Sequence, residues 1–274
     1  MSQVDTDNLY RVQGHKIPFF RTPAFEGDAN LVHGIFGRQG GVSPPPFDSL
    51  NLSQAVGDTP QAVHENFARA CTALGILPEQ TAACHLYHSA EIVTVTRQNQ
   101  QRVMGWADGL ITAEPNIFLA MRFGDCTPLL FFDPVRQAVG LTHAGWRGTM
   151  KNAAGATVSA MTKRLGCRPK DIITVIGPAI GPCCYEVGPD VVQAAGESFA
   201  DITDLFRKNG RPDHAHFDMW TANRRQLAAS GVTQIIETKM CTACHTDLFF
   251  SHRAEKGKTG RFGVIIGLRR KISA

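Results

Sequence analysis

Residues 138–148, AVGLTHAGWRG, run from an apolar segment through a glycine-containing turn into a predicted helix. Short apolar runs bounded by turn residues are typical of strands, so we predict a strand over 138–142. A helix is predicted over 149–165, because Gly166 is a common helix terminator. The stretch therefore predicts a strand–turn–helix unit with His143 at the end of the strand.

The rest of the chain mixes short strands and helices without a strict strand–helix–strand repeat. A helix over 60–74 is predicted from its helical spacing of apolar residues, with Asp58 or Thr59 as N-cap. The last apolar run, 262–268, predicts a strand buried on both faces. This mixture favours an α+β or mixed α/β fold over a Rossmann sheet. Further strands are expected at 92–96, 117–121, 129–132 and 172–176, and helices at 189–199 and 219–229, with a loop containing residues 208–212 between these two helices.

Composition and charge limit the possible partners. Lys and Arg number 28 and Asp and Glu 24, giving a net charge of +4 on 274 residues. This charge is too small to indicate a nucleic-acid partner, although anionic substrates remain compatible with it. Residues 1–8 are polar, the basic residues 269–271 are interpreted as a solvated end, and no run approaches the roughly 20 apolar residues of a membrane span. We therefore expect a cytoplasmic protein that binds neither nucleic acid nor membrane.

Three short motifs combine two imidazoles with one thiol. His88 precedes the strand at 92–96, Cys126 follows GD at a strand-to-turn junction, and His143 ends the strand at 138–142. Two histidines and a cysteine form a zinc ligand set with an open fourth position. The same residues could instead supply a Cys–His nucleophile. Either alternative predicts an enzyme with His88, Cys126 and His143 as catalytic residues.

Other polar and sulfur-containing residues carry weaker signals. Arg147 lies between Gly145 and Gly148 in a predicted strand-to-helix turn and could bind a phosphate or carboxylate. The CxxC pair at 241–244 has no second CxxC in the chain, which favours a structural or incidental role. Adjacent Cys183 and Cys184 cannot both point into one pocket from an extended chain, so we expect at least one of them to be packed. With eight cysteines in a protein expected to be cytoplasmic, thiols or metal ligands are favoured over disulfides.

Together these motifs resemble the YfiH family, also called the laccase-domain or multicopper polyphenol oxidase family, now regarded as purine nucleoside phosphorylases. The segments THAGWRG and CCYEVG are specific to that family, and the resemblance covers roughly residues 33–268. The matching stretches are 33–36 (HGIF), 49–52 (SLNL), 88–89 (HS), 107–110 (ADGL), 124–128 (GDCTP), 142–148 (THAGWRG), 176–181 (IGPAIG), 183–188 (CCYEVG), 241–242 (CT) and 259–261 (TGR).

The resemblance implies one four-layer α/β/β/α domain of the YfiH-like cysteine hydrolase type. Residues 1–32 would be an N-terminal segment of this domain and residues 33–270 its catalytic part. The implied metal is zinc, with copper possible, bound by His88, Cys126 and His143. The implied reactions are phosphorolysis of adenosine, inosine, guanosine or methylthioadenosine to base and ribose 1-phosphate, and deamination of adenosine. The acid–base group for deamination is open among Asp125, His85 and Glu186, and the expected substrate or anion contacts are Arg147, Asn51, Asp125 and Arg261.

Two other enzyme classes stay open. A hydrolase acting on a small or cell-wall-precursor substrate would use the Cys126 thiolate as nucleophile, activated by His143. A copper-dependent, laccase-like polyphenol oxidase would need many histidines arranged in His-x-His pairs. The chain has ten histidines but only one such pair, at 214 and 216, so phenol oxidation is expected to be weak.

Overall fold

The computed structural model describes residues 8–12, 17–208, 210–211 and 213–270. The polar start at 1–7, two positions of the expected 208–212 loop (209 and 212) and Lys271 of the basic end lie outside these residues. None of the described helices combines the length and the apolar character that a membrane crossing requires.

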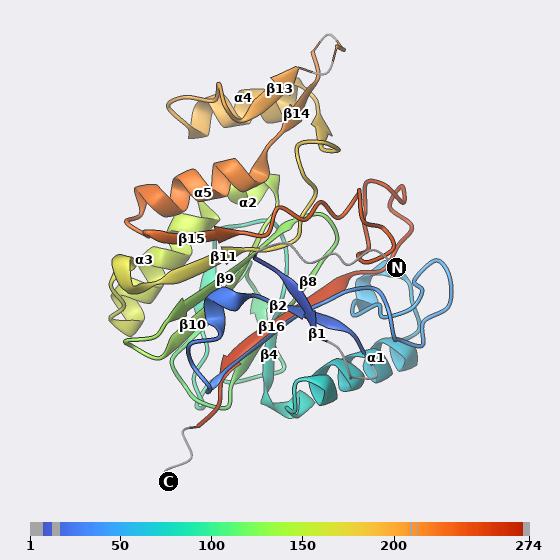
Figure 1. Ribbon diagram of the computed structural model, residues 1–274, viewed down its shortest axis with the longest axis vertical. Helices are drawn as coiled ribbons and strands as arrows, with labels where there is room; N and C mark the ends of the chain where they lie inside the picture. The colour runs from blue at the N-terminus through green and yellow to red at the C-terminus, as the bar shows by residue number, and fades with distance from the viewer. Residues whose placement is uncertain (1–7, 13–16, 209, 212, 271–274) are drawn as a thin grey trace.

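Two large sheets form the body of the protein (Figure 1). Each sheet buries one face against the other, and the apolar side chains of the predicted strands form a common core between them. The strand order of the first is β1 (Tyr10–Val12), β2 (Phe19–Arg21), β3 (Leu31–Phe36), β16 (Phe262–Leu268), β8 (Phe118–Phe123), β4 (Thr81–His85) and β6 (Val103–Trp106). The second has the order β15 (Gln234–Glu237), β11 (Ile173–Ile176), β9 (Thr127–Asp133), β10 (Ala138–Ala144), β7 (Gly109–Thr112) and β5 (Ile92–Thr94).

The strand β16 explains why one segment is continuously apolar. It lies between β3 and β8 and is antiparallel to both, and all seven of its residues are buried. Val264 and Ile266 pack with Leu130 and Leu141 of the second sheet in one core. Burial of each such side chain contributes about 1.5–3 kcal/mol. The predicted strand at 262–268 is confirmed with both of its ends.

Helices cover the outer faces of the two sheets. The apolar side of α3 (Ala153–Leu165) packs through Val158 and Met161 on the second sheet, with α5 (Met219–Ala229) beside it (Figure 1). On the first sheet, α1 (Pro60–Ala73) packs through Phe67 and Ala70. Thr59 caps α1 by accepting a hydrogen bond from the Ala62 amide, as one of the two predicted N-caps. Short 3-10 turns cover Pro23–Phe25, Gln54–Val56, Pro78–Gln80 and Pro169–Asp171.

The predicted helix over 149–165 is wrong in one respect, because the chain forms two helices there. The first, α2 (Trp146–Met150), begins directly after Gly145, and α3 begins after Asn152. Asn152 has a φ of 59°, a left-handed conformation that interrupts the helix. Its side-chain Oδ1 accepts a hydrogen bond from the Gly155 amide at 3.1 Å and so starts the second helix.

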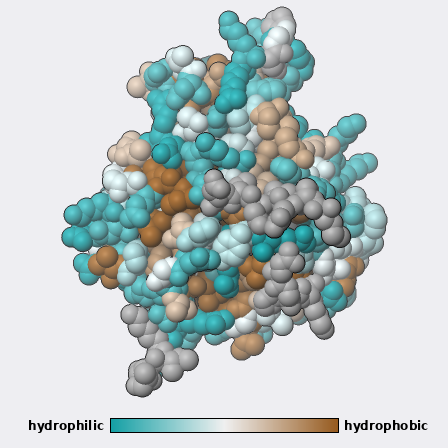
Figure 2. Space-filling model, viewed as in Figure 1, coloured by the Kyte–Doolittle hydropathy of each residue, from teal (hydrophilic) through white to brown (hydrophobic). Residues whose placement is uncertain are grey.

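A third, small sheet stands at one end of the molecule. It contains β12 (Glu186–Val187), β14 (Ala215–Phe217) and β13 (Phe206–Lys208), and α4 (Pro189–Ser198) accompanies it (Figure 1). The loop expected between α4 and α5 is therefore partly a pair of strands, which were too short to be predicted from periodicity. This end is mostly hydrophilic on the face shown in Figure 2.

Candidate metal centre

The structure brings His88, Cys126 and His143 together. One ligand atom from each residue lies within 4.8 Å of the other two, and the Cys126 Sγ is 3.9 Å from the His88 Nε2. Cys126 lies in the turn between β8 and β9, and His143 lies near the end of β10. Antiparallel pairing of β9 with β10 sets Thr127 opposite Ala144, so the turn and the strand end meet. The sheet register thus brings the thiol to the imidazole.

A buried carboxylate, Asp108, arranges two of these ligands. Its oxygens accept hydrogen bonds from the backbone amides of Tyr87, His88 and Ser89, at 3.3, 3.1 and 2.6 Å. These bonds hold the loop in which His88 adopts a φ of 62°. A residue without glycine's freedom needs such support to stay in this left-handed region.

Asp108 also sets the tautomer of His143. Its Oδ1 lies 2.9 Å from the His143 Nδ1, and its backbone oxygen accepts a hydrogen bond from the His143 amide at 2.7 Å. With a proton on Nδ1, the lone pair of Nε2 faces the cluster, which is how metal-binding histidines are commonly oriented. Burial raises the pKa of Asp108, but bonds from His143 and Ser89 outweigh this and lower it to about 2.

Asp108 was not predicted as a functional residue. It is completely buried at the start of an apolar strand, 35 positions from His143. The available signal was its position directly before an apolar strand, where an aspartate is expected to be buried. A buried carboxylate needs hydrogen-bond donors, which suggests a specific role. Its donors could not be identified from neighbouring residues.

The three ligands form a strongly polarised group. Burial disfavours the thiolate of Cys126, but the adjacent His143 and His88 outweigh burial and lower its pKa to about 6. Burial likewise opposes charge on His143, whereas Cys126 and Asp108 raise its pKa to about 9. Both shifts favour a thiolate on Cys126 and a proton on His143 in the metal-free protein. A cation bound here would take the place of the imidazolium proton.

Close packing around the cluster requires glycine at position 145. A Cβ there would lie 2.7 Å from the Cys126 Sγ and 3.0 Å from the His88 Cδ2. Gly124, on the other side of Cys126, lies under the Arg261 side chain, whose Cδ would be 2.7 Å from an added Cβ. Both glycines in the quoted motifs thus make room for side chains that surround the thiol.

The donor set fits a metal ion that accepts nitrogen and sulfur ligands. Two imidazoles and one thiolate are present at mutual distances that one ion can span, and His143 is already oriented by a carboxylate. Zinc uses such three-residue sets with an open position, and copper also binds His₂Cys sets.

Asp125 lies beside Cys126 but engages the surrounding loops with both carboxylate oxygens. Its Oδ1 accepts a hydrogen bond from the Thr242 Oγ1 at 2.7 Å, and its Oδ2 accepts one from the Arg253 amide at 2.6 Å. Its φ is 91°, and its backbone oxygen accepts a bond from Ile180 at 2.9 Å. In this arrangement Asp125 holds three segments around the metal centre.

Arg261 and Asn51 form one unit near the thiol. The Asn51 Oδ1 accepts hydrogen bonds from the amides of Arg261 and Ser53, and its Nδ2 donates to the Ser53 oxygen and to Asp58. Asn51 is completely buried, so an effect on substrate would act through Arg261. Burial lowers the pKa of Arg261, and the Cys126 and Asp125 charges counteract this.

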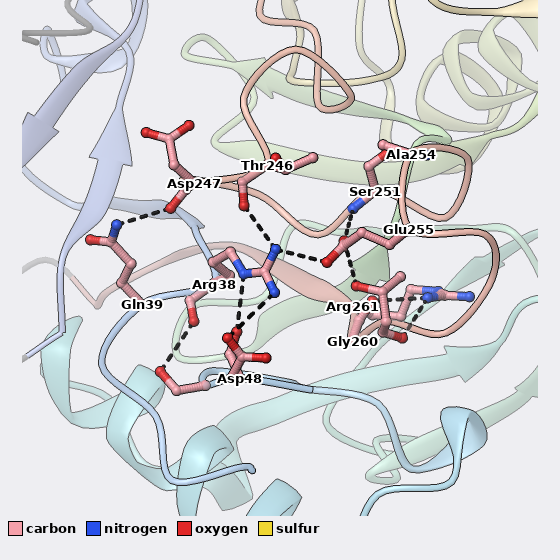
Figure 3. A network of polar contacts seen from close by, with 12 residues as sticks. Arg38, Gln39, Asp48, Thr246, Asp247, Ser251, Ala254, Glu255, Gly260 and Arg261 are labelled. Carbon is pink, nitrogen blue, oxygen red and sulfur yellow. Dashed lines mark hydrogen bonds and ion pairs between the residues drawn. The ribbon is translucent and has the colours of Figure 1, made fainter. Parts of the chain in front are cut away.

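A polar network fixes the loop that carries Arg253 and Arg261 (Figure 3). The Arg38 Nη1 donates to the Thr246 oxygen at 2.8 Å and to the Glu255 Oε1 at 2.9 Å. The other oxygen of Glu255 accepts bonds from the Ser251 amide and the Thr259 hydroxyl. The guanidinium of Arg38 also lies 4.6 Å from the centre of the Phe250 ring.

A cavity of about 340 Å³ lies between α2 and the small sheet, and its lining begins at Trp146, the residue after Gly145. The guanidinium of Arg147 lies 4.1 Å from the centre of the Trp146 ring, and that of Arg253 lies 5.2 Å from the Tyr185 ring. Burial and the nearby Cys126 raise the pKa of Tyr185, which links this wall to the metal ligands. The lining residues are Trp146, Arg147, Tyr185, Glu186, Val187, Gly188, Asp190, Val191, His214 and Arg253.

The remaining acid–base candidates differ in position. Glu186 lines the cavity and forms an ion pair with Arg211. His85 is exposed and packs against Trp106, with ring centres 5.1 Å apart, outside the cluster of ligands. Arg253 and Tyr185 were not predicted as site residues, because the loops that carry them have no periodic pattern.

Comparison with known proteins agrees with the resemblance drawn from the motifs. The family described as multi-copper polyphenol oxidoreductase laccase matches residues 32–269. A protein of Geobacillus stearothermophilus named purine nucleoside phosphorylase YlmD is 39% identical over 250 residues, covering 88% of this chain and 91% of its own. Its namesake in Bacillus subtilis is 33% identical over 253 residues, covering 89% and 91%.

A solved structure gives the same result for the fold. The crystal structure of the Bacillus licheniformis protein YfiH superposes with a TM-score of 0.88 at 33% sequence identity, covering 94% of this chain and 99% of that one. The mixed α+β prediction is confirmed. The chain belongs to the laccase-domain family that includes the YfiH and YlmD proteins.

Proposed function

We propose that this protein is a zinc-dependent purine nucleoside phosphorylase that also deaminates adenosine. The observation that carries the proposal is the convergence of His88, Cys126 and His143. A cavity with arginine-covered aromatic rings begins at Trp146, next to the Gly145 that packs on this cluster. Relatives named purine nucleoside phosphorylase, matched over nearly nine-tenths of this chain, support the substrate class. The expected substrates are adenosine, inosine, guanosine or methylthioadenosine, together with phosphate.

The three ligands would hold zinc, and copper is the alternative ion. When bound, zinc supplies a Lewis acid that lowers the pKa of a coordinated water to about 7. Asp108 keeps the His143 Nε2 directed at the ion and holds the backbone that presents His88. Gly145 leaves the thiol enough space to ligate without displacement.

The cavity walls supply the other requirements of phosphorolysis. Arg147 and Arg253, which lie over the Trp146 and Tyr185 rings, offer guanidinium groups for phosphate and flat surfaces for a purine. In the reaction, a phosphate oxygen forms the bond to the ribose C1′, the bond from C1′ to the base breaks, and the base gains a proton. The proton that the base gains is the one that hydrogen phosphate brings. Of the three acid–base candidates for the deamination, Glu186 lines the cavity, and we assign the proton transfers of that reaction to it.

The polarised thiol supports a second candidate, a hydrolase in which Cys126 attacks the substrate. The Cys126 Sγ lies 3.9 Å from the His88 Nε2, and the pKa of Cys126 is lowered to about 6. A covalent adduct on Cys126, found by mass spectrometry after rapid quenching with substrate, would favour this candidate. Turnover without any adduct would favour the phosphorylase.

Three finer features belong to the same proposal. The sheets with helices on both outer faces support a four-layer α/β/β/α architecture of the YfiH-like cysteine hydrolase type. The pairing of β2 with β3 supports one domain that includes residues 1–32 as well as 33–270. A cytoplasmic location suits a thiolate ligand, because thiols persist in reducing compartments.

The test is an assay of zinc-loaded protein with a nucleoside panel, with and without phosphate. We expect adenine and ribose 1-phosphate from adenosine only when phosphate is present, and inosine in either case. His88→Ala, Cys126→Ala and His143→Ala should each abolish both activities, whereas His85→Ala, in an exposed histidine three positions away, should keep them. Full activity in all three folded ligand variants would refute the assignment.

A further inference from the structure

A second group of sulfur atoms lies apart from the catalytic ligands. The Sγ atoms of Cys183, Cys184, Cys241 and Cys244 all lie within 4.8 Å of one another. The Cys244 Sγ is 3.5 Å from that of Cys183 and 3.4 Å from that of Cys184. The CxxC pair, which had no partner in the sequence, therefore meets the adjacent cysteine pair from 60 positions away.

Cys184 is partly buried and packs against the core, as expected for at least one of the adjacent cysteines, yet both thiols converge because the chain there is not extended. The amides of Cys184 and Tyr185 both donate to the Gly181 oxygen at 3.0 Å, which closes a tight turn. In a turn, unlike in a strand, consecutive side chains can converge. Both thiols consequently face Cys244.

The backbone holds the two cysteine pairs together independently of any sulfur ligand. Strands β11 and β15 are parallel, and their pairing continues as a bridge between Ala179 and Cys241. The Ala179 amide donates to the Met240 oxygen, and the Thr242 amide donates to the Ala179 oxygen, both at 3.1 Å. Because parallel strands end at the same edge of a sheet, both cysteine turns lie at that edge.

The spacing fits one tetrahedral ion. With Zn–S bonds of about 2.3 Å, the edge of a tetrahedron of sulfurs is about 3.8 Å. The two shortest sulfur distances, 3.4 and 3.5 Å, lie close to this value. The Gly181 amide also donates to the Cys241 Sγ at 3.2 Å, a contact that stabilises a thiolate.

We propose that Cys183, Cys184, Cys241 and Cys244 bind one zinc ion in a closed tetrathiolate site, distinct from the centre at His88, Cys126 and His143. Four protein ligands leave no open position, so the role of this ion is structural. The site connects two segments. One is the turn before Tyr185 and Glu186, and the other is the loop whose Thr242 donates a hydrogen bond to Asp125. It thereby fixes one wall of the cavity against the catalytic centre.

The test counts metal ions in reduced, full-length protein. Native mass spectrometry and elemental analysis after loading with Zn²⁺ and removal of loosely bound ions should give two zinc ions per chain. The variant His88→Ala/Cys126→Ala/His143→Ala should retain one, and Cys241→Ser/Cys244→Ser should also retain one. The matched control Cys71→Ala/Cys167→Ala, which removes two buried thiols outside both clusters, should retain two.

Cobalt identifies the ligands without relying on the folding of the cysteine variants. Co²⁺ bound to the protein with the three catalytic ligands replaced should show the intense sulfur-to-cobalt charge-transfer absorption of a thiolate site. A single zinc ion in the reduced wild-type protein, together with no cobalt absorption in that variant, would overturn the proposal. The proposal would also be overturned if the four cysteines form disulfides and, after reduction, bind neither zinc nor cobalt.

Discussion

Replacement of Asp108 by asparagine tests the arrangement of the metal centre most directly. The aspartate accepts hydrogen bonds on both oxygens, from His143 and His88 on Oδ1 and from Ser89 and Tyr87 on Oδ2. An asparagine has only one acceptor oxygen and places an NH₂ group at the other position. It therefore cannot satisfy both sets of donors, whichever way the amide is turned.

Each orientation of the amide has a defined cost. If the NH₂ group points toward Ser89, it faces the Ser89 amide, which is also a donor and which lies 2.6 Å from the Asp108 Oδ2 in the wild-type protein. Each buried donor left unsatisfied costs about 1–3 kcal/mol. With NH₂ toward His143, the Nδ1 must become an acceptor, the proton moves to Nε2, and the metal loses that ligand. Loss of such an orienting carboxylate typically weakens metal binding about 10–100-fold.

We therefore expect Asp108→Asn to bind zinc about 10–100-fold more weakly and to unfold at lower denaturant concentration. Zinc affinity is measured by competition with a chromophoric chelator, and stability by urea unfolding of the metal-free protein. Asp133→Asn is the matched control, because Asp133 is also completely buried and accepts amide bonds from Val135 and Arg136, in a turn outside the cluster of ligands. Both bonds go to its Oδ1, which an asparagine retains, so this variant should keep its fold and its zinc affinity. A folded Asp108→Asn protein with wild-type zinc affinity would refute the role given to Asp108.

Two further predictions concern the thiol. The first is Gly145→Ala. The backbone conformation allows alanine, since φ is −72°, but the added Cβ would lie 2.7 Å from the Cys126 Sγ, so we expect zinc to bind at least about tenfold more weakly in the chelator assay. Gly196→Ala in α4 is the control, because an added Cβ there meets open space, and it should keep wild-type affinity. In metal-free protein the thiolate fraction of Cys126 grows as the pH rises through about 6, so the rate of its alkylation by iodoacetamide should rise with a midpoint near pH 6. Cys71 and Cys84 are the controls. Burial raises their pKa values to about 12, so they should stay unmodified at pH 7. Peptide mass spectrometry resolves the sites; protection by zinc should accompany the low midpoint, and a midpoint near 9 would contradict the polarised pair.

Much of the fold follows from local sequence patterns. The continuous apolar run of β16 and the helical spacing in α1 each indicated an element that the structure contains. These patterns are readable because burial on one or both faces imposes a period on neighbouring residues. His143 could be placed at a strand end for the same reason.

Only the tertiary structure decided which of these residues meet. Asp108 is 35 positions from His143, and Cys184 is 60 positions from Cys244, so neither contact leaves a pattern in neighbouring residues. The convergence of Cys183 and Cys184 depends on a turn at Gly181, and the space for Cys126 depends on the missing side chain of Gly145. The amino-acid sequence alone therefore determined the elements and the chemical groups available to this protein. Strand register and turn geometry determined which groups share a site, because these contacts depend on long-range packing and not on local propensity.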